Sequence, residues 1–359
     1  MNEASNEIII AMEGRAAIVR LNRPQSMNAV TLGMIHELSA LYHRCAKDPR
    51  ICGAVVEAEG KAFSAGGDIR TLRDWMANDL AQADAFYAEE YQHNWLLQCF
   101  RKRHVALLNG VTMGGGVGIS IFGTHRVAGE AMSFAMPETG IGFFPDVGGS
   151  WFLPRMPGMI GMYLGLTGHI CNRADAYYAG AVTHCIPAAQ FGTVKAAMIE
   201  AEPIDAVLDG LHAHPGESHL EKHREPIDRV FGAPSVEEIL RQLENEQGEW
   251  REWARKTLAV LATKAPLSLK VAHEQLRRGK ACKTLKEALV MEYRLATRLI
   301  RLPDFPEGIR AVIVDKDRSP KWQPASLGEV SDTYVLSLFE PLPPGDLKLV
   351  DYWMPPLHG

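Results

Sequence analysis

Four glycines, Gly114, Gly115, Gly116 and Gly118, fall within five positions of the stretch NGVTMGGGVGIS, residues 109–120. The apolar run HVALL before them predicts a buried strand, and the apolar residues after them predict the start of a helix. Close packing of that helix on a sheet explains one or two of the glycines, but not all four together. The others indicate a strand end where backbone N–H groups are open to a ligand.

A second strand end with small residues occurs in KAFSAGGDIR, residues 61–70, just before another expected helix. Two interpretations are open there: Asp68 caps the helix, or the backbone of Ala65, Gly66 and Gly67 turns its N–H groups toward an anion at the helix start. The glycine run at residues 109–120 has neither the Rossmann spacing nor the G-K-[ST] of a phosphate-binding loop. Together the two strand ends can each supply one N–H to a single oxygen, the arrangement that acyl chemistry needs.

The third candidate is FAMPETGIGFFPDVGGS, residues 134–150, where Glu138 and Asp146 are the only charged residues. A buried carboxylate without a partner is costly, and apolar surroundings raise its pKa toward neutrality. The alternative is structural, with Asp146 capping a helix and Glu138 paired with an arginine. Beside two possible oxyanion donors, the two acids favour a catalytic interpretation.

The chain changes character along its length. Residues 7–23 predict a hairpin, and apolar periodicity predicts alternating helices and strands up to about residue 137, which is an α/β pattern. From Pro145 onward helical patterns dominate. The polar stretch 211–226 predicts a boundary between an α/β core that carries the active site, residues 1–210, and a mainly helical C-terminal region, residues 211–359.

Composition and charge exclude several function classes. At 359 residues, 47% hydrophobic and net charge -5, the chain predicts a globular protein with no general affinity for nucleic acid. It lacks a C-x-x-C pair and an apolar run of about 20 residues, so we expect a reducing, cytoplasmic location and no membrane partner. Four histidines cluster within residues 212–223, and the i,i+4 pair His219 and His223 can ligate a metal. Without H-E-x-x-H in so polar a segment, we expect a solvated loop and no metal site.

With these stretches in place, the sequence resembles the crotonase (enoyl-CoA hydratase/isomerase) superfamily over nearly its whole length. LNRPQSMNAV, AFSAGGDIR and TMGGGVG carry the resemblance at the superfamily level. Residues 134–155, the segment MEYRLATR and residues 307–322 are similar to the branch that hydrolyses 3-hydroxyisobutyryl-CoA. The resemblance implies a spiral of ββα units followed by a helical region, often assembled as trimers, with acyl-CoA as substrate and no metal or redox cofactor.

The resemblance also implies roles for individual residues. The N–H groups of Gly67 and Gly115 would form the oxyanion hole for the thioester carbonyl, Glu138 would be the catalytic acid, and Asp146, with Glu90, would orient the substrate. The CoA channel would be lined, partly through backbone atoms, by Ser26, Met27, Ala65, Asp68, Ile69 and Arg70.

One departure narrows the expected reaction. Hydratases of this family carry a second glutamate at the position that matches Gly118, so the pair that holds the attacking water is incomplete here. We therefore expect hydrolysis of a short-chain β-hydroxyacyl-CoA thioester, such as 3-hydroxyisobutyryl-CoA in valine breakdown. A hydratase or isomerase that uses Glu138 alone, and a protein that binds acyl-CoA without catalysis, are the alternatives.

Overall fold

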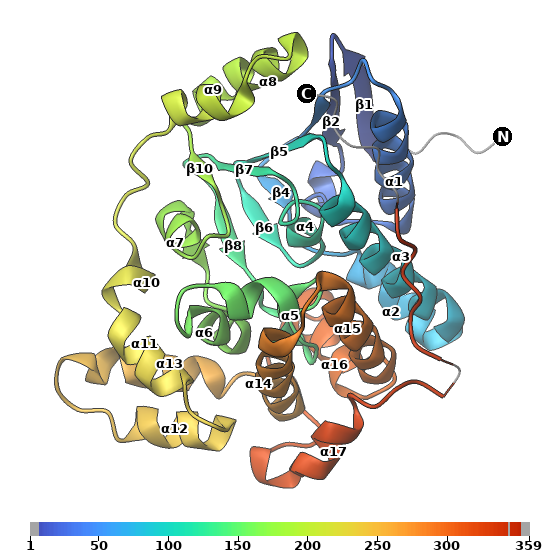
Figure 1. Cartoon of the computed structure of the whole chain (residues 1–359). Coiled ribbons are helices and arrows are strands. Elements are labelled where there is room, and N and C mark those ends of the chain that lie inside the picture. The colour runs from blue at the N-terminus through green and yellow to red at the C-terminus, as the bar shows by residue number, and fades with distance from the viewer. Residues whose placement is uncertain (1–6, 344, 353–359) are drawn as a thin grey trace.

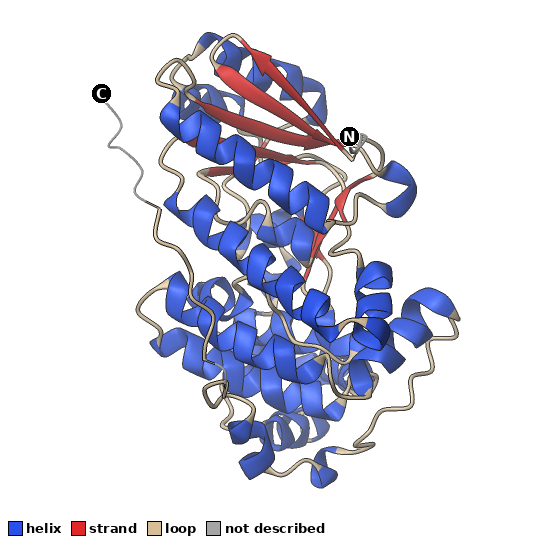
Figure 2. Cartoon of the chain, turned by 90° about the vertical axis from the view of Figure 1, so that its right-hand side faces the viewer, coloured by secondary structure: helices blue, strands red, loops and turns tan. Residues whose placement is uncertain are grey.

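A computed structural model describes residues 7–343 and 345–352 of the chain. Its strands form two sheets within residues 8–185, and helices pack below and around them (Figure 1). In the view of Figure 2 the strands occupy the upper part of the molecule and helices fill the lower part. The mixed α/β class expected from the sequence is confirmed.

The larger sheet has six strands in the order β1-β2-β3-β5-β7-β10. β1 and β2 form the expected antiparallel hairpin, and the other neighbours pair in parallel. The bounds are Ile8–Glu13 (β1), Ala16–Leu21 (β2), Gly53–Ala58 (β3), Arg103–Leu108 (β5), His125–Ala128 (β7) and His184–Cys185 (β10).

The smaller sheet runs β4-β6-β8-β9, with bounds Ala62–Ser64, Val111–Met113, Ser133–Ala135 and Cys171–Asn172. Its first three strands are parallel, and each directly follows a strand of the larger sheet: β4 follows β3, β6 follows β5 and β8 follows β7. Each turn of the chain thus adds one strand to each sheet, which is the ββα spiral implied by the resemblance.

Helices connect these turns and build the rest of the molecule. In the first part they are α1 (Leu32–Lys47), α2 (Ile69–Asn78), α3 (Leu80–Cys99), α4 (Gly115–Gly118), α5 (Gly149–Phe152), α6 (Ile160–Thr167), α7 (Arg173–Tyr178), α8 (Phe191–Glu200) and α9 (Ile204–Leu211). The later ones are α10 (His219–Lys222), α11 (Arg224–Phe231), α12 (Val236–Glu244), α13 (Arg251–Leu261), α14 (Pro266–Ala281), α15 (Leu285–Leu299), α16 (Asp304–Ile309) and α17 (Asp332–Ser337).

The stretch 211–226 differs in part from the expected surface excursion. Residues 219–222 form α10, α11 begins at Arg224, and the Leu220 side chain is 1% exposed. Leu220 gives this polar segment one apolar anchor, which explains why part of it folds against the protein. The division into residues 1–210 and 211–359 stays a prediction.

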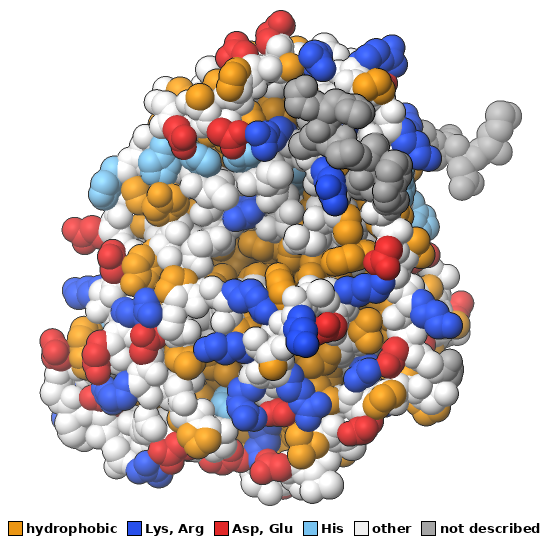
Figure 3. Space-filling view, in the orientation of Figure 1, with side chains coloured by type: hydrophobic (Ala, Val, Ile, Leu, Met, Phe, Trp, Pro, Cys, Tyr) orange, Lys and Arg blue, Asp and Glu red, His pale blue; other side chains and the backbone are white. Residues whose placement is uncertain are grey.

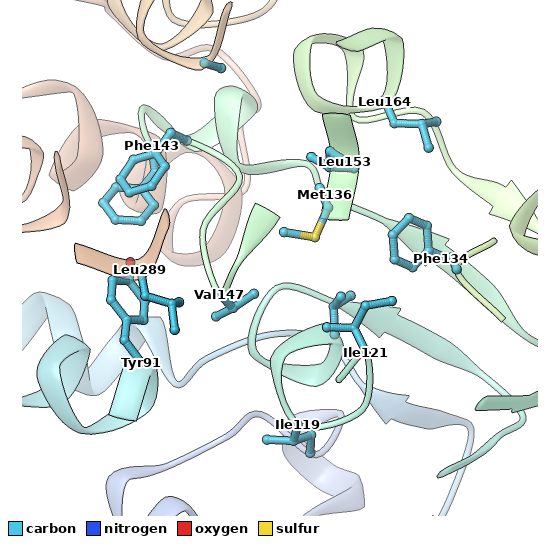
Figure 4. Packing of buried hydrophobic residues seen from close by; sticks show 14 of the residues in the cluster. Tyr91, Ile119, Ile121, Phe134, Met136, Phe143, Val147, Leu153, Leu164 and Leu289 are labelled. Carbon is cyan, nitrogen blue, oxygen red and sulfur yellow. The ribbon is translucent and has the colours of Figure 1, made fainter. Parts of the chain in front are cut away.

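Alternating side chains of the larger sheet face two separate cores, as the two-residue period of a strand requires. Along β3, Val55 faces a small cluster under α8 and α9, whereas Ala54 and Val56 face the main core. The main core contains buried side chains from Ile8 to Leu349 and therefore joins the strands to the C-terminal helices. Figure 4 shows part of it, and Figure 3 shows a band of hydrophobic side chains across the middle of the molecular surface.

Candidate active site

The two glycine-bearing strand ends lie side by side. β4 and β6 pair in parallel, with Ser64 opposite Thr112, so the loops that follow them emerge at the same edge of the smaller sheet. A Cβ atom built on Gly115 would lie 3.2 Å from the backbone nitrogen of Gly67. Among the described residues, neither the Gly67 N–H nor the Gly115 N–H donates a hydrogen bond. Two open backbone donors therefore border one small volume.

Positive φ angles shape both loops. Gly66 has φ +128° and Gly114 has φ +45°, values that side chains with a Cβ rarely adopt. These two turns redirect the chain immediately before Gly67 and Gly115. Gly66 and Gly114 thus serve the backbone conformation, and the residues after them, Gly67 and Gly115, line the pocket described below.

Glu138 lies across from this glycine pair. It begins a 3-10 turn, Glu138–Ile141, directly after β8, and its Oε1 would be 3.3 Å from a Cβ built on Gly114. The side chain is 6% exposed, and Oε2 is buried without a hydrogen-bond partner in the described residues. Burial first, and then the charge of Asp146, raise the pKa of Glu138 well above its usual value, while the Lys264 ammonium opposes the shift.

Asp146 is also buried, at 6% exposure, in the turn that leads into α5. The Tyr91 hydroxyl, from α3, donates a hydrogen bond of 3.1 Å to its Oδ2. Burial raises the pKa of Asp146 to about 7, although the Tyr91 hydrogen bond favours the charged form. The carboxyl can therefore donate or accept a hydrogen bond near neutral pH.

Glu90, also from α3, is the third acid at this place. Its Oε1 is buried without a partner in the described residues and would be 2.9 Å from a Cβ built on Gly115. Burial, followed by the charges of Asp146 and Glu292, raises the pKa of Glu90 well above its usual value. Glu90 lines the same pocket as Glu138 and Asp146, and its role near the substrate stays a prediction.

One pocket collects most of the residues that the sequence singled out. Five of its lining residues, Asp68 among them, come from the first glycine loop. Three further acids line it from other segments, and Phe305 lines it from the C-terminal region. The lining residues are Ala65, Gly66, Gly67, Asp68, Ile69, Leu72, Phe86, Tyr87, Glu90, Met113, Gly114, Gly115, Pro137, Glu138, Ile141, Phe143, Asp146 and Phe305.

Ser26, Met27 and Arg70 lie outside this lining, whereas Asp68 belongs to it. Ser26 and Arg70 are exposed, and the carbonyl of Met27 accepts a hydrogen bond of 3.0 Å from Ala65 N, so the 24–27 turn borders the first glycine loop. The Asp68 side chain caps α2 and pairs with Arg23 at 3.0 Å, as its structural interpretation required. The CoA-channel role of these residues stays a prediction.

Gly118 has no room for a longer side chain. A Cβ built there would lie 2.9 Å from Asn94 Nδ2 and 3.0 Å from Val147 Cβ. The Asn94 amide also donates a hydrogen bond of 3.1 Å to the Gly118 carbonyl, which fixes this packing. The position that carries a second glutamate in hydratases is thus occupied by neighbouring side chains.

Sequence reasoning missed two residues that hold or tune the site. Glu292, in α15, is fully buried and contacts the turn after Asp146, and Lys264 lies behind Glu138. Glu292 lies on the apolar face of its helix, together with Leu285, Leu289 and Leu295. A charged residue at such a position is the sequence signal that could have identified it. Lys264 follows α13 without a comparable pattern.

Two absences concern only residues 7–343 and 345–352. No group of three or more histidine, cysteine or acidic side chains there has the arrangement of a metal site. No helix in those ranges is long and apolar enough to cross a membrane. His223 instead packs against Trp250 and Trp253, with ring centroids 5.3 and 6.2 Å away.

The arrangement suits reactions in which negative charge develops on an oxygen. Two backbone donors face the pocket without a competing acceptor, and such preorganised donors stabilise an oxyanion more than water does. The neighbouring buried acids have raised pKa values, which suits proton transfer near neutral pH.

Comparisons with known proteins identify the family of the chain. The model of the family described as "Enoyl-CoA hydratase/isomerase" matches residues 16–339. The chain is 40% identical to 3-hydroxyisobutyryl-CoA hydrolase, mitochondrial, of Bos taurus, over 96% of this chain and 92% of that protein.

Two solved structures are similar over almost their whole length. A carnitinyl-CoA dehydratase from Mycobacterium thermoresistibile superposes with a TM-score of 0.90 at 32% identity, covering 96% of this chain and 99% of that one. An enoyl-CoA hydratase from Rhodobacter sphaeroides 2.4.1 gives a TM-score of 0.87 at 38% identity, covering 95% and 99%. The chain belongs to the enoyl-CoA hydratase/isomerase family of the crotonase superfamily, which acts on acyl-CoA thioesters.

Proposed function

We propose that this protein hydrolyses a short-chain β-hydroxyacyl-CoA thioester, with 3-hydroxyisobutyryl-CoA as the first candidate. The observation that carries the proposal is the packing at Gly118, where Asn94 and Val147 leave no space for the second glutamate of a hydratase. An additional acid, Asp146, faces the pocket instead. The lack of an acid at Gly118 and the presence of Asp146 favour attack on the thioester carbonyl over addition of water to a double bond.

In the proposed reaction, the thioester carbonyl oxygen lies between the N–H groups of Gly67 and Gly115. These donors stabilise the oxyanion of the tetrahedral intermediate, and loss of one such donor typically costs about 10²-fold or more in rate. Because neither N–H has an acceptor within the described protein, the substrate oxygen competes with no internal hydrogen bond.

Glu138 supplies the bond-making step by one of two routes. Its carboxylate attacks the carbonyl carbon, which expels the CoA thiolate and leaves an anhydride that water cleaves, or it takes a proton from a water that attacks directly. Both routes consume one water and release the free acid and CoA. Both also need Glu138 ionised, which the Lys264 ammonium favours and burial opposes.

Asp146 and Glu90 supply the contact that selects the acyl group. Both carboxyl groups face the pocket, and burial raises both pKa values. A substrate hydroxyl can exchange hydrogen bonds with a carboxyl in either protonation state. The 40% identity to the bovine 3-hydroxyisobutyryl-CoA hydrolase supports this class of substrate.

A thiol-release assay tests the proposal. The purified protein is mixed with a panel of 3-hydroxyacyl, saturated acyl and 2-enoyl CoA thioesters, and free CoA is followed with a thiol reagent. We expect the fastest release from 3-hydroxyisobutyryl-CoA or 3-hydroxypropionyl-CoA. Absence of release from every thioester, with loss of the enoyl absorbance, would replace hydrolysis by hydration.

Hydration is the second candidate because of Glu90. Its carboxyl lies beside Gly115 on the pocket wall, so it can pair with Glu138 around a water although the Gly118 position is filled. The names of the two similar solved structures, a dehydratase and a hydratase, also describe this chemistry for those proteins. Loss of the enoyl absorbance without thiol release would favour it.

Two expectations from the sequence extend the proposal. A trimer-based assembly follows from the family resemblance, and sedimentation of the purified protein tests it. A cytoplasmic location follows from composition and cysteine usage, whereas the bovine relative carries the word mitochondrial in its name. Fractionation of the source cells decides between the two locations.

A further inference from the structure

The turn that carries Asp146 has a strained backbone. Val147, the next residue, has φ 49°, and Gly148 has φ 85°. A β-branched residue in the left-handed region costs roughly 1–2 kcal/mol, and it persists only where surrounding contacts enforce it. Figure 4 shows Val147 within the buried cluster, with Tyr91 and Leu289 on one side of it and Ile119 and Ile121 on the other.

Glu292 enforces the conformation of this turn from α15. Its Oε2 accepts a hydrogen bond of 2.8 Å from Gly148 N, and its Oε1 accepts one of 2.8 Å from Ser150 N. The side chain is 0% exposed, so both bonds lie away from water. Burial raises the pKa of Glu292 to about 8, whereas the hydrogen bonds from Gly148 and Ser150 favour its charged form. The two bonds bracket residues 148–150, directly after the strained valine.

Gln275 holds the same turn from α14. Its Nε2 donates hydrogen bonds of 2.6 Å to the Pro145 carbonyl and 2.8 Å to Ser150 Oγ. Glu292 and Gln275 thus form hydrogen bonds with residues on both sides of Asp146, and among the described residues neither forms one with Asp146 itself. In Figure 1, α14 and α15 lie beside α5, which begins at Gly149.

No cation explains Glu292. Glu292 forms no ion pair among the described residues, and the acids that interact with its charge are Asp146, Glu90 and Glu138. A buried carboxyl near other acids is unfavourable, and this cost is offset by the two buried backbone N–H groups that would otherwise lack an acceptor. The two hydrogen bonds to the turn are what the carboxylate provides.

We propose that Glu292 and Gln275 are positioning residues that hold the Val147–Gly148 turn so that Asp146 faces the pocket, and that they thereby set the preference for acyl groups with a 3-hydroxyl. The inference rests on the proposed function, because Asp146 is assigned there to the substrate hydroxyl. It adds that two helices of the C-terminal region determine specificity without contact with the substrate.

The test compares 3-hydroxyisobutyryl-CoA with isobutyryl-CoA, the same thioester without the hydroxyl. In Glu292→Gln the side-chain volume is kept, but an amide NH₂ faces a backbone N–H. We expect the ratio of kcat/KM for the two thioesters to fall about tenfold. On isobutyryl-CoA alone, kcat/KM should change less than about threefold, since the oxyanion donors and Glu138 stay in place.

Glu287→Gln is the matched control. Glu287 is exposed on the same helix, and it also accepts a backbone hydrogen bond, 2.8 Å from Lys283 N, at the start of α15. This variant should leave the ratio unchanged. If Glu292→Gln does not fold, Gln275→Met is tested in the same way and decides the matter, because it removes both hydrogen bonds of Nε2 at similar volume.

A double-mutant cycle separates positioning from a general loss of structure. If Glu292 acts through Asp146, Glu292→Gln changes the ratio in the wild-type background but not in the Asp146→Asn background. Equal effects in both backgrounds, or an unchanged ratio in Glu292→Gln, would overturn the inference. If wild type releases CoA from both thioesters equally, the inference fails and thioester hydrolysis stands. Without release from any thioester, the proposed function fails first and the inference with it.

Discussion

The two sides of the pocket are built in opposite ways. On one side, Gly67 and Gly115 offer backbone N–H groups that the paired strands β4 and β6 bring together. On the other side, Glu90, Glu138 and Asp146 are side chains carried by α3 and by two turns after β8, and α14 and α15 hold the last of them. The oxyanion side is a product of the spiral alone, whereas the acid side also needs the C-terminal helices.

The difference indicates which part of the family fold can vary. A backbone donor keeps its chemistry under most substitutions, provided that the strand ends stay in register. An acid in a buried cluster changes its pKa with every neighbour that moves. We therefore expect the glycine side to serve many reactions on acyl thioesters and the acid side to select one of them.

Removal of the acid that performs the bond-making step should give the largest effect. In Glu138→Gln the side chain keeps its size but neither attacks a carbonyl nor takes a proton from water. We expect kcat for thiol release to fall about 10³-fold, with KM little changed, in steady-state assays. An intact kcat would remove Glu138 from the mechanism and transfer the chemistry to Glu90 or Asp146.

The oxyanion side should respond to a single methyl group. In Gly115→Ala the new Cβ would lie 2.9 Å from Glu90 Oε1 and 3.2 Å from Gly67 N, so the two donors must separate or Glu90 must move. We expect a loss of about 10²-fold in kcat, the usual effect of one lost donor. Gly192→Ala is the control, because a Cβ there has no atom within 4 Å in the described structure. An active Gly115→Ala enzyme would mean that the carbonyl binds elsewhere.

The difference between the glycine side and the acid side also explains which parts of the site could be predicted from the sequence. The glycine run at 114–118 and the loop at 65–67 could be located from their composition, because each follows a strand whose apolar pattern is local. Glu138 and Asp146 could be singled out because charges are rare in residues 134–150. Their supports could not: Glu292 reaches the turn across 144 positions of sequence, and only packing in three dimensions shows which residues it contacts.

A smaller effect concerns stability and follows from the burial of Asp146. Its pKa is about 7 in the folded protein and 3.8 ordinarily, so the folded state holds the proton more tightly. Below pH 3.8 Asp146 is protonated in both the folded and the unfolded state, and the folded protein has its full stability. As pH rises from 3.8 through 7, the unfolded chain loses this proton first, so the free energy of unfolding falls. Asparagine does not ionise, so Asp146→Asn removes this fall. Between those pH values, the free energy of unfolding of the variant minus that of wild type should therefore increase by about 1.4 kcal/mol per pH unit.

Denaturant unfolding at pH 5 and pH 7 measures this difference. Asp74→Asn, on the exposed face of α2, is the control and should show the pH dependence of wild type. If the free energy of unfolding of Asp146→Asn and of wild type changed equally with pH, Asp146 would be hydrated or paired in the folded protein. Its pKa would then be that of an ordinary surface carboxyl group.

The smallest effect tests whether the C-terminal region also tunes Glu138. Lys264 Nζ would lie 3.3 Å from a Cβ built on Gly140, within the turn that carries Glu138, and its charge lowers the pKa of that acid. In Lys264→Met the pKa of Glu138 should rise, which moves the acid limb of the kcat/KM profile to higher pH by less than one unit. Activity at high pH should stay unchanged, because Glu138 is ionised there in both proteins.

Lys256→Met is the control, because Lys256 pairs with Glu252 at 3.5 Å. An equal decrease in kcat/KM at every pH would show that Lys264 supports the position of the turn and not the pKa of Glu138. The C-terminal region would then determine the geometry of the three acids but not their protonation.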